Sequence, residues 1–468
     1  MKNKYIEYYL SIFKNNNQIH NKTINKDNKP YFFIMYNSQM IDKKSLNLIV
    51  IKELLESIAK DYDLEHSSLV DLKEINVFSK EEIENNIYSG GVIIFSLKEK
   101  KLYSINLANM ISRTPSLDSQ EIVYSGSKDN LIESLDTNLS LIYKRLKTSE
   151  LINEMYTIGS LSKTRVSLLH LNNFIDDKLL DNIKKSIQDI NINALTSIGD
   201  FATHLYKRKN IVPMLTYCSK VDLLEQALLS GKVIIIIDGI PEGIVLPISL
   251  FTFSSYDDAI NESFIVTLFN KVFSLLGMFI SLFFLGLYTS IILYEPDLIP
   301  YNILINIYNS YKGVALSSQL ELIVVYLFFQ IFFHAGNKSL SGLSGSLLII
   351  GSLLIGQVAV SSGFISQITL IIVAISIFSC FIISNNIALN TSFMFLQLII
   401  FISSLLFGLV GYLVSLLLIL IYLNSLESFT IPYLYPFSNL NFTKIKESFF
   451  SSTYLKKKGK KKWKKQYF

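Results

Sequence analysis

The sequence is poor in the residues that build catalytic and metal sites. It has two cysteines, five histidines and one tryptophan in 468 residues. Cys218 and Cys380 lie far apart, which excludes a disulfide framework and a cysteine-based metal site and favours a reducing location. Charged residues make up only 17% of the chain, a low share for a soluble protein of this length.

Patterns for nucleophilic, metal or nucleotide chemistry are also missing. The histidines are isolated, and the chain contains neither an HExxH motif nor a glycine-rich phosphate loop. Asp238-Gly239 follows the run VIIII, where an acidic residue at a strand end resembles part of a nucleotide site, but Asp-Gly between two strands more commonly forms a hairpin turn. We therefore expect no enzyme activity, no cofactor and no bound metal.

The chain changes composition near residue 264. The residues before it are rich in lysine, asparagine and glutamate, and those after it form long apolar runs. Eight lysines lie in 456–465, more than the whole net charge of +5, so basic character belongs to a C-terminal tail. Such a block beside membrane segments indicates the cytoplasmic side, although an unstructured solubilising tail fits equally well. The N-terminus lacks the apolar core of a signal peptide, so we expect a cytoplasmic head.

The polar half predicts an α/β fold with two similar subdomains, 31–145 and 146–263, after a flexible leader over 1–30. Runs of β-branched and aromatic residues predict strands, and runs with helical spacing predict helices. The predicted strands are 31–37, 91–97, 101–107, 164–171, 233–239 and 243–251, and the helices are 47–63, 81–88, 177–190 and 221–231. Residues 82–96 align without gaps to 223–237, which fits either a duplication or a common αβ turn.

The apolar half, 264–427, predicts a polytopic helical membrane domain of four to six segments, followed by the tail 428–468. Three runs are long enough to cross an apolar core about 30 Å thick: 273–294, 343–360 and 367–384. The shorter run 321–336 is interfacial, re-entrant or buried inside the bundle. The run 393–424 is too long for one straight crossing, so it must tilt, protrude or break, and Gly408 and Gly411 are the natural place to break.

Small and polar residues inside these runs are candidate packing or conduit positions. Small residues allow close helix approach in a membrane, and an intramembrane amide or carboxyl group needs a partner or a wet cavity. Packing within one subunit and a seam or conduit between subunits both remain open. The carboxyl group of Glu321 fits either an ion path or a favourable place at a helix N-terminus. The candidates are Gly345, Gly351, Gly356, Gln357, Gly363 and Glu321.

Several stretches occur in an order that resembles the A-subunit family of spore germinant receptors, from about 115 to 436. LIESLDTNLSLIYKRL (131–146) carries the family's Glu133, Asn138 and Arg145, and the strand SGKVIIIIDG ends in Asp238-Gly239. GSLLIIGSLLIGQVAVSSGFIS (345–366) is the most specific match, and SLESFTIPYLYPF (425–437) follows the last apolar run. Where the family has Pro-Phe-Pro before a glutamate, the chain has ALSSQLE and keeps Glu321.

This resemblance implies a non-enzymatic subunit of a nutrient receptor in the spore inner membrane. Such A subunits work with a transporter-like B subunit, which binds the germinant, and with a lipoprotein C subunit. The resemblance further implies self-association and transmission of ligand binding into ion release. A self-contained secondary transporter, or an ion-conducting membrane protein unrelated to germination, is the alternative. A transporter would usually show inverted repeats among its spans, and we see none in the sequence.

Overall fold

The computed structural model describes residues 4–13, 16, 18–26, 29–60, 62–64, 67, 69, 71–75, 79–108, 129–172, 174–206, 210–253, 264–338, 356–384, 386–435 and 437–439. The chain divides into two compact units. The head is drawn from 1–209 and 215–247, and the membrane body from 210–214 and 248–457.

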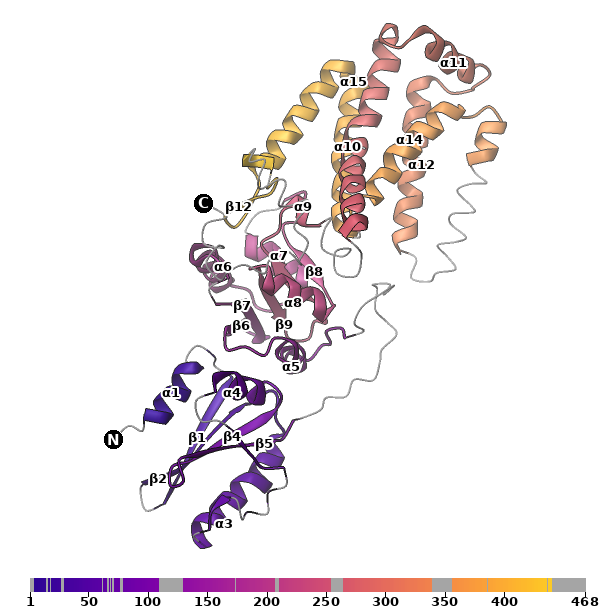
Figure 1. Ribbon diagram of the computed structural model, residues 1–468. Helices are drawn as coiled ribbons and strands as arrows, with labels where there is room; N and C mark the ends of the chain where they lie inside the picture. The colour runs from indigo at the N-terminus through magenta and orange to yellow at the C-terminus, as the bar shows by residue number, and fades with distance from the viewer. Residues whose placement is uncertain are drawn as a thin grey trace. The chain divides into compact units, whose positions relative to one another are not determined.

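The head contains two five-stranded antiparallel sheets with the same strand order (Figure 1). The first has the order β1-β2-β4-β5-β3, and its strands are β1 (Ile19–Lys26), β2 (Lys29–Asn37), β3 (Lys73–Ile75), β4 (Gly91–Ser96) and β5 (Lys101–Asn106). The second has the order β6-β7-β9-β10-β8, and its strands are β6 (Leu151–Ile158), β7 (Thr164–Leu171), β8 (Thr216–Cys218), β9 (Val233–Ile237) and β10 (Gly243–Leu246).

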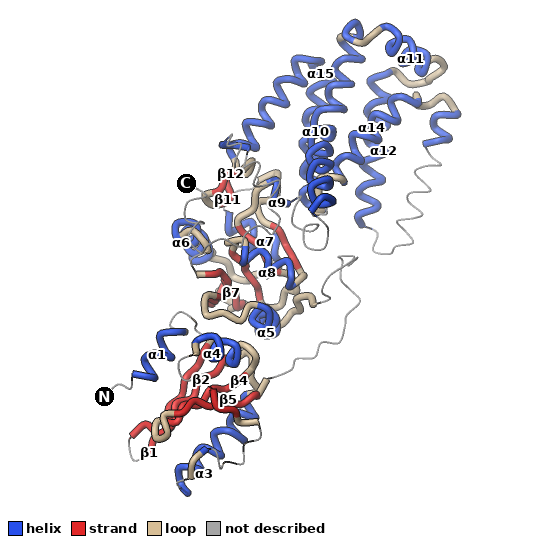
Figure 2. The backbone as a smooth tube through the Cα atoms, viewed as in Figure 1, coloured by secondary structure: helices blue, strands red, loops and turns tan. Residues whose placement is uncertain are grey.

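The helices occur at the same places in the order of elements of the two subdomains. Figure 2 draws these helices in blue and the strands in red. One helix precedes the first strand of each sheet, α1 (Lys4–Ile12) or α5 (Leu135–Arg145), and one precedes the central hairpin, α4 (Lys80–Ile87) or α8 (Val221–Leu229). The long crossover holds α2 (Lys43–Ser45), η1 (Leu46–Ile51) and α3 (Lys52–Lys60) in the first subdomain, and α6 (Asp177–Gln188) and α7 (Ile198–Tyr206) in the second. This shared topology confirms two similar α/β subdomains.

The structure corrects two of the expected boundaries. Residues 4–12 and 19–26, expected in a flexible leader, form α1 and the edge strand β1, which pairs along its length with β2. Most side chains of β1 are exposed, so backbone hydrogen bonds rather than apolar burial hold it, and its composition looks like that of a loop. Helix α5, expected at the end of the first subdomain, packs on α8 and β9 of the second.

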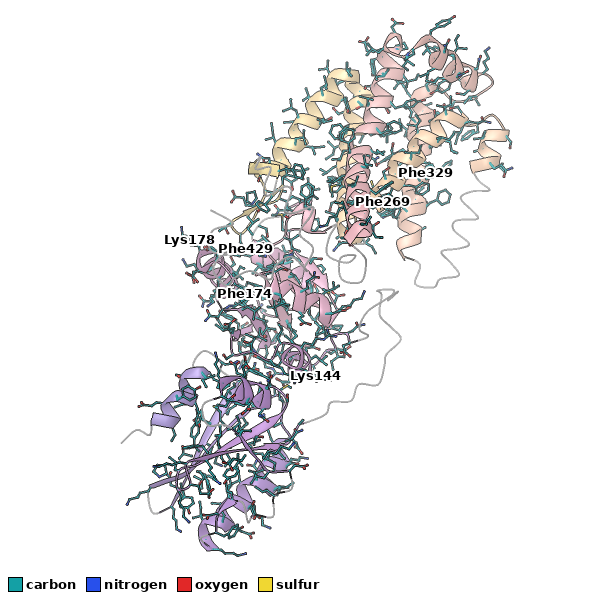
Figure 3. The ribbon with its side chains drawn as sticks, in the orientation of Figure 1. Lys144, Phe174, Lys178, Phe269, Phe329 and Phe429 are labelled. Atoms are coloured by element: carbon teal, nitrogen blue, oxygen red, sulfur yellow. The ribbon has the colours of Figure 1, made fainter. Side chains whose placement is uncertain are left out.

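The membrane body is a bundle of apolar helices. Its elements are α9 (Leu250–Phe253), α10 (Phe264–Tyr294), η3 (Pro296–Leu298), α11 (Tyr301–Tyr311), α12 (Ser318–Lys338), α14 (Gln367–Phe381), α15 (Ile387–Ser425), the two-residue strands β11 (Glu427–Ser428) and β12 (Ile431–Pro432), and η4 (Phe437–Asn439). α10 packs against α14 and α15, and α12 packs against α14. Phe329 of α12 meets Phe378 of α14 edge to face at 5.7 Å between ring centroids, whereas Phe269 of α10 is largely exposed (Figure 3).

Three helices in the described residues are long and apolar enough to cross a membrane, namely α10, α12 and α15. The run around Glu321, for which three placements were open, therefore lies in a helix of crossing length. α14 is shorter, at 15 residues. Residues 356–361 are helical, but most of the expected crossing 343–360, with Gly345 and Gly351, lies outside the described residues.

α15 reverses direction at Gly408. Of the three possibilities left open for the long apolar run, a tilt, a protrusion or a break, the structure shows the break, at one of the two glycines named for it. Gly408 has φ +59° and ψ −141°, which lie outside the helical region and suit a residue without a Cβ. The Ser403 hydroxyl donates to the Gly411 carbonyl oxygen at 2.8 Å. In a straight helix these residues would be about 12 Å apart. The two halves therefore diverge from a shared bend at Gly408 (Figure 1).

Residues 210–214 connect α7 to β8 but belong to the membrane body. The Ser392 hydroxyl, in the first half of α15, donates to the Ile211 carbonyl oxygen at 2.8 Å. The Ile211 N–H donates to the Tyr422 hydroxyl, in the second half, at 2.9 Å. The Ser428 hydroxyl of β11 donates to the Met214 carbonyl oxygen at 3.2 Å. Both halves of α15 and the strand after them thus hold this short segment.

Candidate functional site

Glu321 is a fully buried carboxyl group in the first turn of α12. Its Oε1 accepts the backbone N–H of Ser366 at 2.7 Å, and Ser366 is the N-cap residue of α14. Its Oε2 is buried and has no hydrogen-bond partner among the described residues. A side chain from one helix thus satisfies the start of another, 45 residues further along the chain.

Two connecting loops bring Glu321 to Ser366. The Ala315 N–H, in the loop before α12, donates to the Gly363 carbonyl oxygen at 2.9 Å, in the loop before α14. Gly363 has φ +69°, and a Cβ on it would lie 2.7 Å from the Gly313 carbonyl oxygen. A side chain there would need both a left-handed backbone and space that the other loop occupies. Gly363 therefore lies in a turn where the two loops meet. The sequence had suggested a position on a helix face.

A row of hydroxyl groups continues from Ser366 across the bundle. The Ser366 and Thr369 hydroxyls are 2.9 Å apart, and the Thr369 and Tyr311 hydroxyls are 3.2 Å apart. The Tyr311 hydroxyl lies 3.4 Å from that of Tyr288. We call Glu321, Ser366, Thr369, Tyr311 and Tyr288 the polar cluster. Its members come from α10, α11, α12 and α14 or the N-cap of α14, so the cluster ties four helices together.

The electrostatics of the cluster rest on helix ends rather than on a basic partner. Glu321 lies in the first turn of α12 and contacts the N-cap of α14, and both helix N-termini carry partial positive charge. In the described part of the chain no lysine or arginine pairs with it. An acidic side chain at this depth is costly unless such groups compensate for lost water.

A second buried polar group lies between α12 and α15. The Gln330 side chain donates to the Tyr326 hydroxyl at 2.8 Å, and that hydroxyl donates to the Met394 carbonyl oxygen at 3.4 Å. Gln397 of α15 is only 1% exposed, and neither atom of its amide has a partner among the described residues. His334, one helical turn after Gln330 in α12, is exposed.

The other sequence candidates in the membrane body lie outside the polar cluster. Gln357 is exposed, and among the described residues a Cβ on Gly356 would meet only a Leu370 methyl group at 3.7 Å, an ordinary contact. The tight glycines were missed. A Cβ on Gly277 would lie 2.8 Å from the Ser379 carbonyl oxygen, and one on Gly286 would clash with Ile400. The sequence did contain a signal for them. Both are glycines among large apolar residues of the first span, and close approach of another helix is what favours glycine at such a position.

In the head, the family-motif residues converge on the start of α5. Asp238 Oδ1 accepts the N–H of Leu135, the first residue of α5, at 3.1 Å. Asp238 Oδ2 accepts from Arg165 Nε at 3.0 Å and lies 2.9 Å from Arg165 Nη2. The hydrogen bond to Asp238 raises the pKa of Arg165. Gly239 follows in the β9–β10 turn and donates its N–H to the Glu133 carbonyl oxygen at 2.8 Å.

The remaining motif residues fix the same helix. Asn138 is fully buried, and its amide both accepts from the Ile132 N–H at 2.8 Å and donates to the Ile132 carbonyl oxygen at 2.6 Å. Arg145, at the other end of α5, pairs with Glu225 at 3.5 Å and with Asp129 at 3.4 Å. The structure thus brings all five residues together around α5, where their contacts are structural.

The pKa of a half-buried carboxylate in the second sheet is also strongly shifted. Glu154 of β6 contacts His170, Lys184 and Tyr156. Burial raises the pKa of Glu154, but the three hydrogen bonds outweigh it and lower the pKa to about 2. Among the described residues, no group of three or more His, Cys, Asp or Glu side chains could hold a metal ion.

A head of two α/β subdomains joined to a body of apolar helices defines a membrane protein with a large soluble N-terminal region. A family model described as Bacillus/Clostridium GerA spore germination protein matches residues 7–463. The chain therefore belongs to this family of spore germination proteins.

Relatives match most of the length of the chain. Spore germination protein XA of Bacillus anthracis is 30% identical over 428 residues, which is 89% of this chain and 86% of that protein. Spore germination protein KA of Bacillus subtilis (strain 168) is 24% identical over 436 residues, 91% of this chain and 79% of that protein. The crystal structure of the N-terminal domain of the A subunit of the Bacillus megaterium spore germinant receptor GerK3 is 19% identical, with a TM-score of 0.35, and covers 51% of this chain and 92% of that one. The chain is a diverged member of its family.

Proposed function

We propose that the chain is the A-type membrane subunit of a nutrient receptor and helps to trigger spore germination without enzyme activity of its own. Family membership over residues 7–463 carries this proposal. The B-type subunit, which is transporter-like, would bind the germinant, and the C-type subunit is a lipoprotein. The head and the lysine-rich tail face the spore core, and the helical body lies in the spore inner membrane.

The membrane body would self-associate and convert binding on its partner into ion release. Because α15 reverses at Gly408, it offers two segments of about 31 and 25 Å, and each approaches the thickness of an apolar core. An even number of crossings would keep the head and tail on one side. Glu321, Gln357 and the glycines from 345 to 363 remain candidates for a conduit or a seam between subunits.

Gly356 allows a clean test of that seam. A Cβ on it would lie 3.7 Å from a Leu370 methyl group, its nearest contact outside its own helix among the described residues, so these residues leave room for a Cβ there. We expect Gly356→Leu to abolish nutrient-triggered ion release and germination if another subunit packs there. The measurement compares spores complemented with the wild type, Gly356→Ala or Gly356→Leu, with immunoblots of spore membranes as the control for protein level.

Two results would count against the proposal. Spores that lack the chain and still release ions and germinate at the wild-type rate in every nutrient mixture would contradict the germination role. Normal germination with Gly356→Leu at wild-type protein level would reject the seam at Gly356 while leaving that role standing.

A further inference from the structure

α11 is an amphipathic helix, and the other helices of the bundle cover only part of its apolar side. At about 100° per residue, its isoleucines, leucine and tyrosines fill an arc of roughly 200°, and the remaining arc carries polar residues. The apolar arc holds Tyr301, Ile303, Leu304, Ile305, Ile307, Tyr308 and Tyr311, and the polar arc holds Asn302, Asn306, Asn309 and Ser310.

The bundle occupies only the middle of the apolar arc. Ile307 is 5% exposed, and Tyr311 joins the polar cluster. On the flank beside them, Tyr301 is 74% exposed and Tyr308 is 52% exposed, with Ile305 also exposed. This flank is apolar, lacks charge and borders the polar arc directly.

The position of α11 limits what can cover this flank. Six residues separate it from the end of α10, and six separate it from the start of α12, both of crossing length. Figure 1 shows α11 at the end of the bundle where α10 finishes. Tyr294, the last residue of α10, and Leu320, in the first turn of α12, are exposed apolar residues, so the bundle also presents apolar surface at the two helix ends that adjoin α11 in the sequence. Tyrosine is enriched at membrane–water interfaces, where one end of its ring is apolar and the other is wet.

We propose that α11 binds the lipid interface of the membrane that the bundle spans, with Tyr301, Ile305 and Tyr308 among the acyl chains just below the headgroups. The asparagines of the polar arc face water. The helix carries no charged residue, so burial of apolar surface holds it there rather than attraction to anionic lipid.

Tryptophan fluorescence of the full chain in phosphatidylcholine vesicles tests this placement. Trp463→Phe removes the single native tryptophan. In that background Tyr308→Trp reports the apolar flank, Tyr301→Trp repeats the measurement at a more exposed site, and Asn302→Trp is the matched control on the polar arc. We expect lipids brominated near the headgroup to quench the two flank probes more than lipids brominated near the chain end. Aqueous iodide should quench the control instead.

Each other outcome contradicts the proposal. Quenching of the flank probes by iodide but not by brominated lipid would place α11 off the membrane. Protection of both flank probes from both quenchers would mean that protein, either a second copy or another chain, covers the flank. Equal quenching of flank and control probes by lipid would mean that the polar arc does not face water.

Discussion

In the head and in the membrane body, one acidic side chain holds the start of a helix that is distant in sequence. Asp238 accepts the N–H of Leu135 at the start of α5, and Glu321 accepts the N–H of Ser366 at the start of α14. The compensating groups differ. Asp238 is partly exposed and pairs with Arg165, whereas Glu321 is fully buried and relies on two helix N-termini. The comparison teaches that the membrane body fixes its helices with backbone and hydroxyl groups where the head uses ion pairs.

The largest effect should follow loss of the buried carboxyl group. Glu321→Leu leaves the buried Ser366 N–H without an acceptor and should destabilise the body by about 2–3 kcal/mol. Glu321→Gln keeps an acceptor and should cost about 1 kcal/mol. Thermal unfolding of the detergent-solubilised chain measures both, with the exposed Glu295→Gln as the control. Equal stability of Glu321→Leu and the wild type would remove Glu321 from its role at α14.

The next largest effect concerns the loops that bring Glu321 to Ser366. Gly363→Ala imposes a left-handed alanine and a contact of 2.7 Å with the Gly313 carbonyl oxygen, and should cost about 2 kcal/mol. Gly356→Ala meets no such obstacle among the described residues and should stay within about 0.5 kcal/mol of the wild type. The same unfolding measurement compares them. Similar losses of stability in both variants would show that the loop contact does not make Gly363 more sensitive to substitution than Gly356.

A smaller effect is expected in the head. Asp238→Ala removes both the acceptor for α5 and the partner of Arg165, and should cost about 1.5 kcal/mol. Hydrogen exchange in the full chain should increase at the first turn of α5, and Asp181→Ala on the exposed face of α6 should leave it unchanged. If Arg165→Ala alone reproduced the whole effect, the ion pair rather than the helix start would be the important contact.

The smallest effect should depend on pH. The pKa of Glu154 is about 2 in the folded head against 4.5 ordinarily, so its contribution is fully present above pH 4.5 and is lost as the pH falls towards 2. Glu154→Gln should remove a pH-dependent contribution of about 1 kcal/mol or less. Unfolding temperatures of the two chains should therefore differ most near neutral pH and converge in acid. A constant difference across this range would contradict the assignment.

The sequence predicted the helices and strands whose side chains show a regular apolar pattern. The buried strands β4 and β9 and the helices α4 and α8 were expected, because the period of their apolar residues encodes them directly. Gly408 was one of two glycines named as the place where the long apolar run could break. The edge strand β1 was missed because its stability comes from backbone pairing with β2 and its side chains face water.

The candidate site was only half predictable. Glu321 stood out as a rare acidic residue among apolar runs, but its partner Ser366 depends on two loops meeting at Gly363 and Gly313, which no local pattern encodes. Gln357 stood out as an amide inside an apolar run, and it is exposed. The helix α5 was placed with the wrong subdomain because its contacts with α8 and β9 are distant in sequence. The order of elements could have indicated the right subdomain, because α5 precedes β6 just as α1 precedes β1.

The two backbone hydrogen bonds of Ile211 link the two halves of α15. Its N–H is bonded to Tyr422 in one half of α15 and its carbonyl oxygen to Ser392 in the other. If the two halves spread about Gly408, these attachment points separate, and at least one of the two bonds must stretch or break. The exchange rate of the Ile211 amide hydrogen would therefore rise if the two halves of α15 moved apart, and in the sequence this residue lies between α7 and β8 of the head.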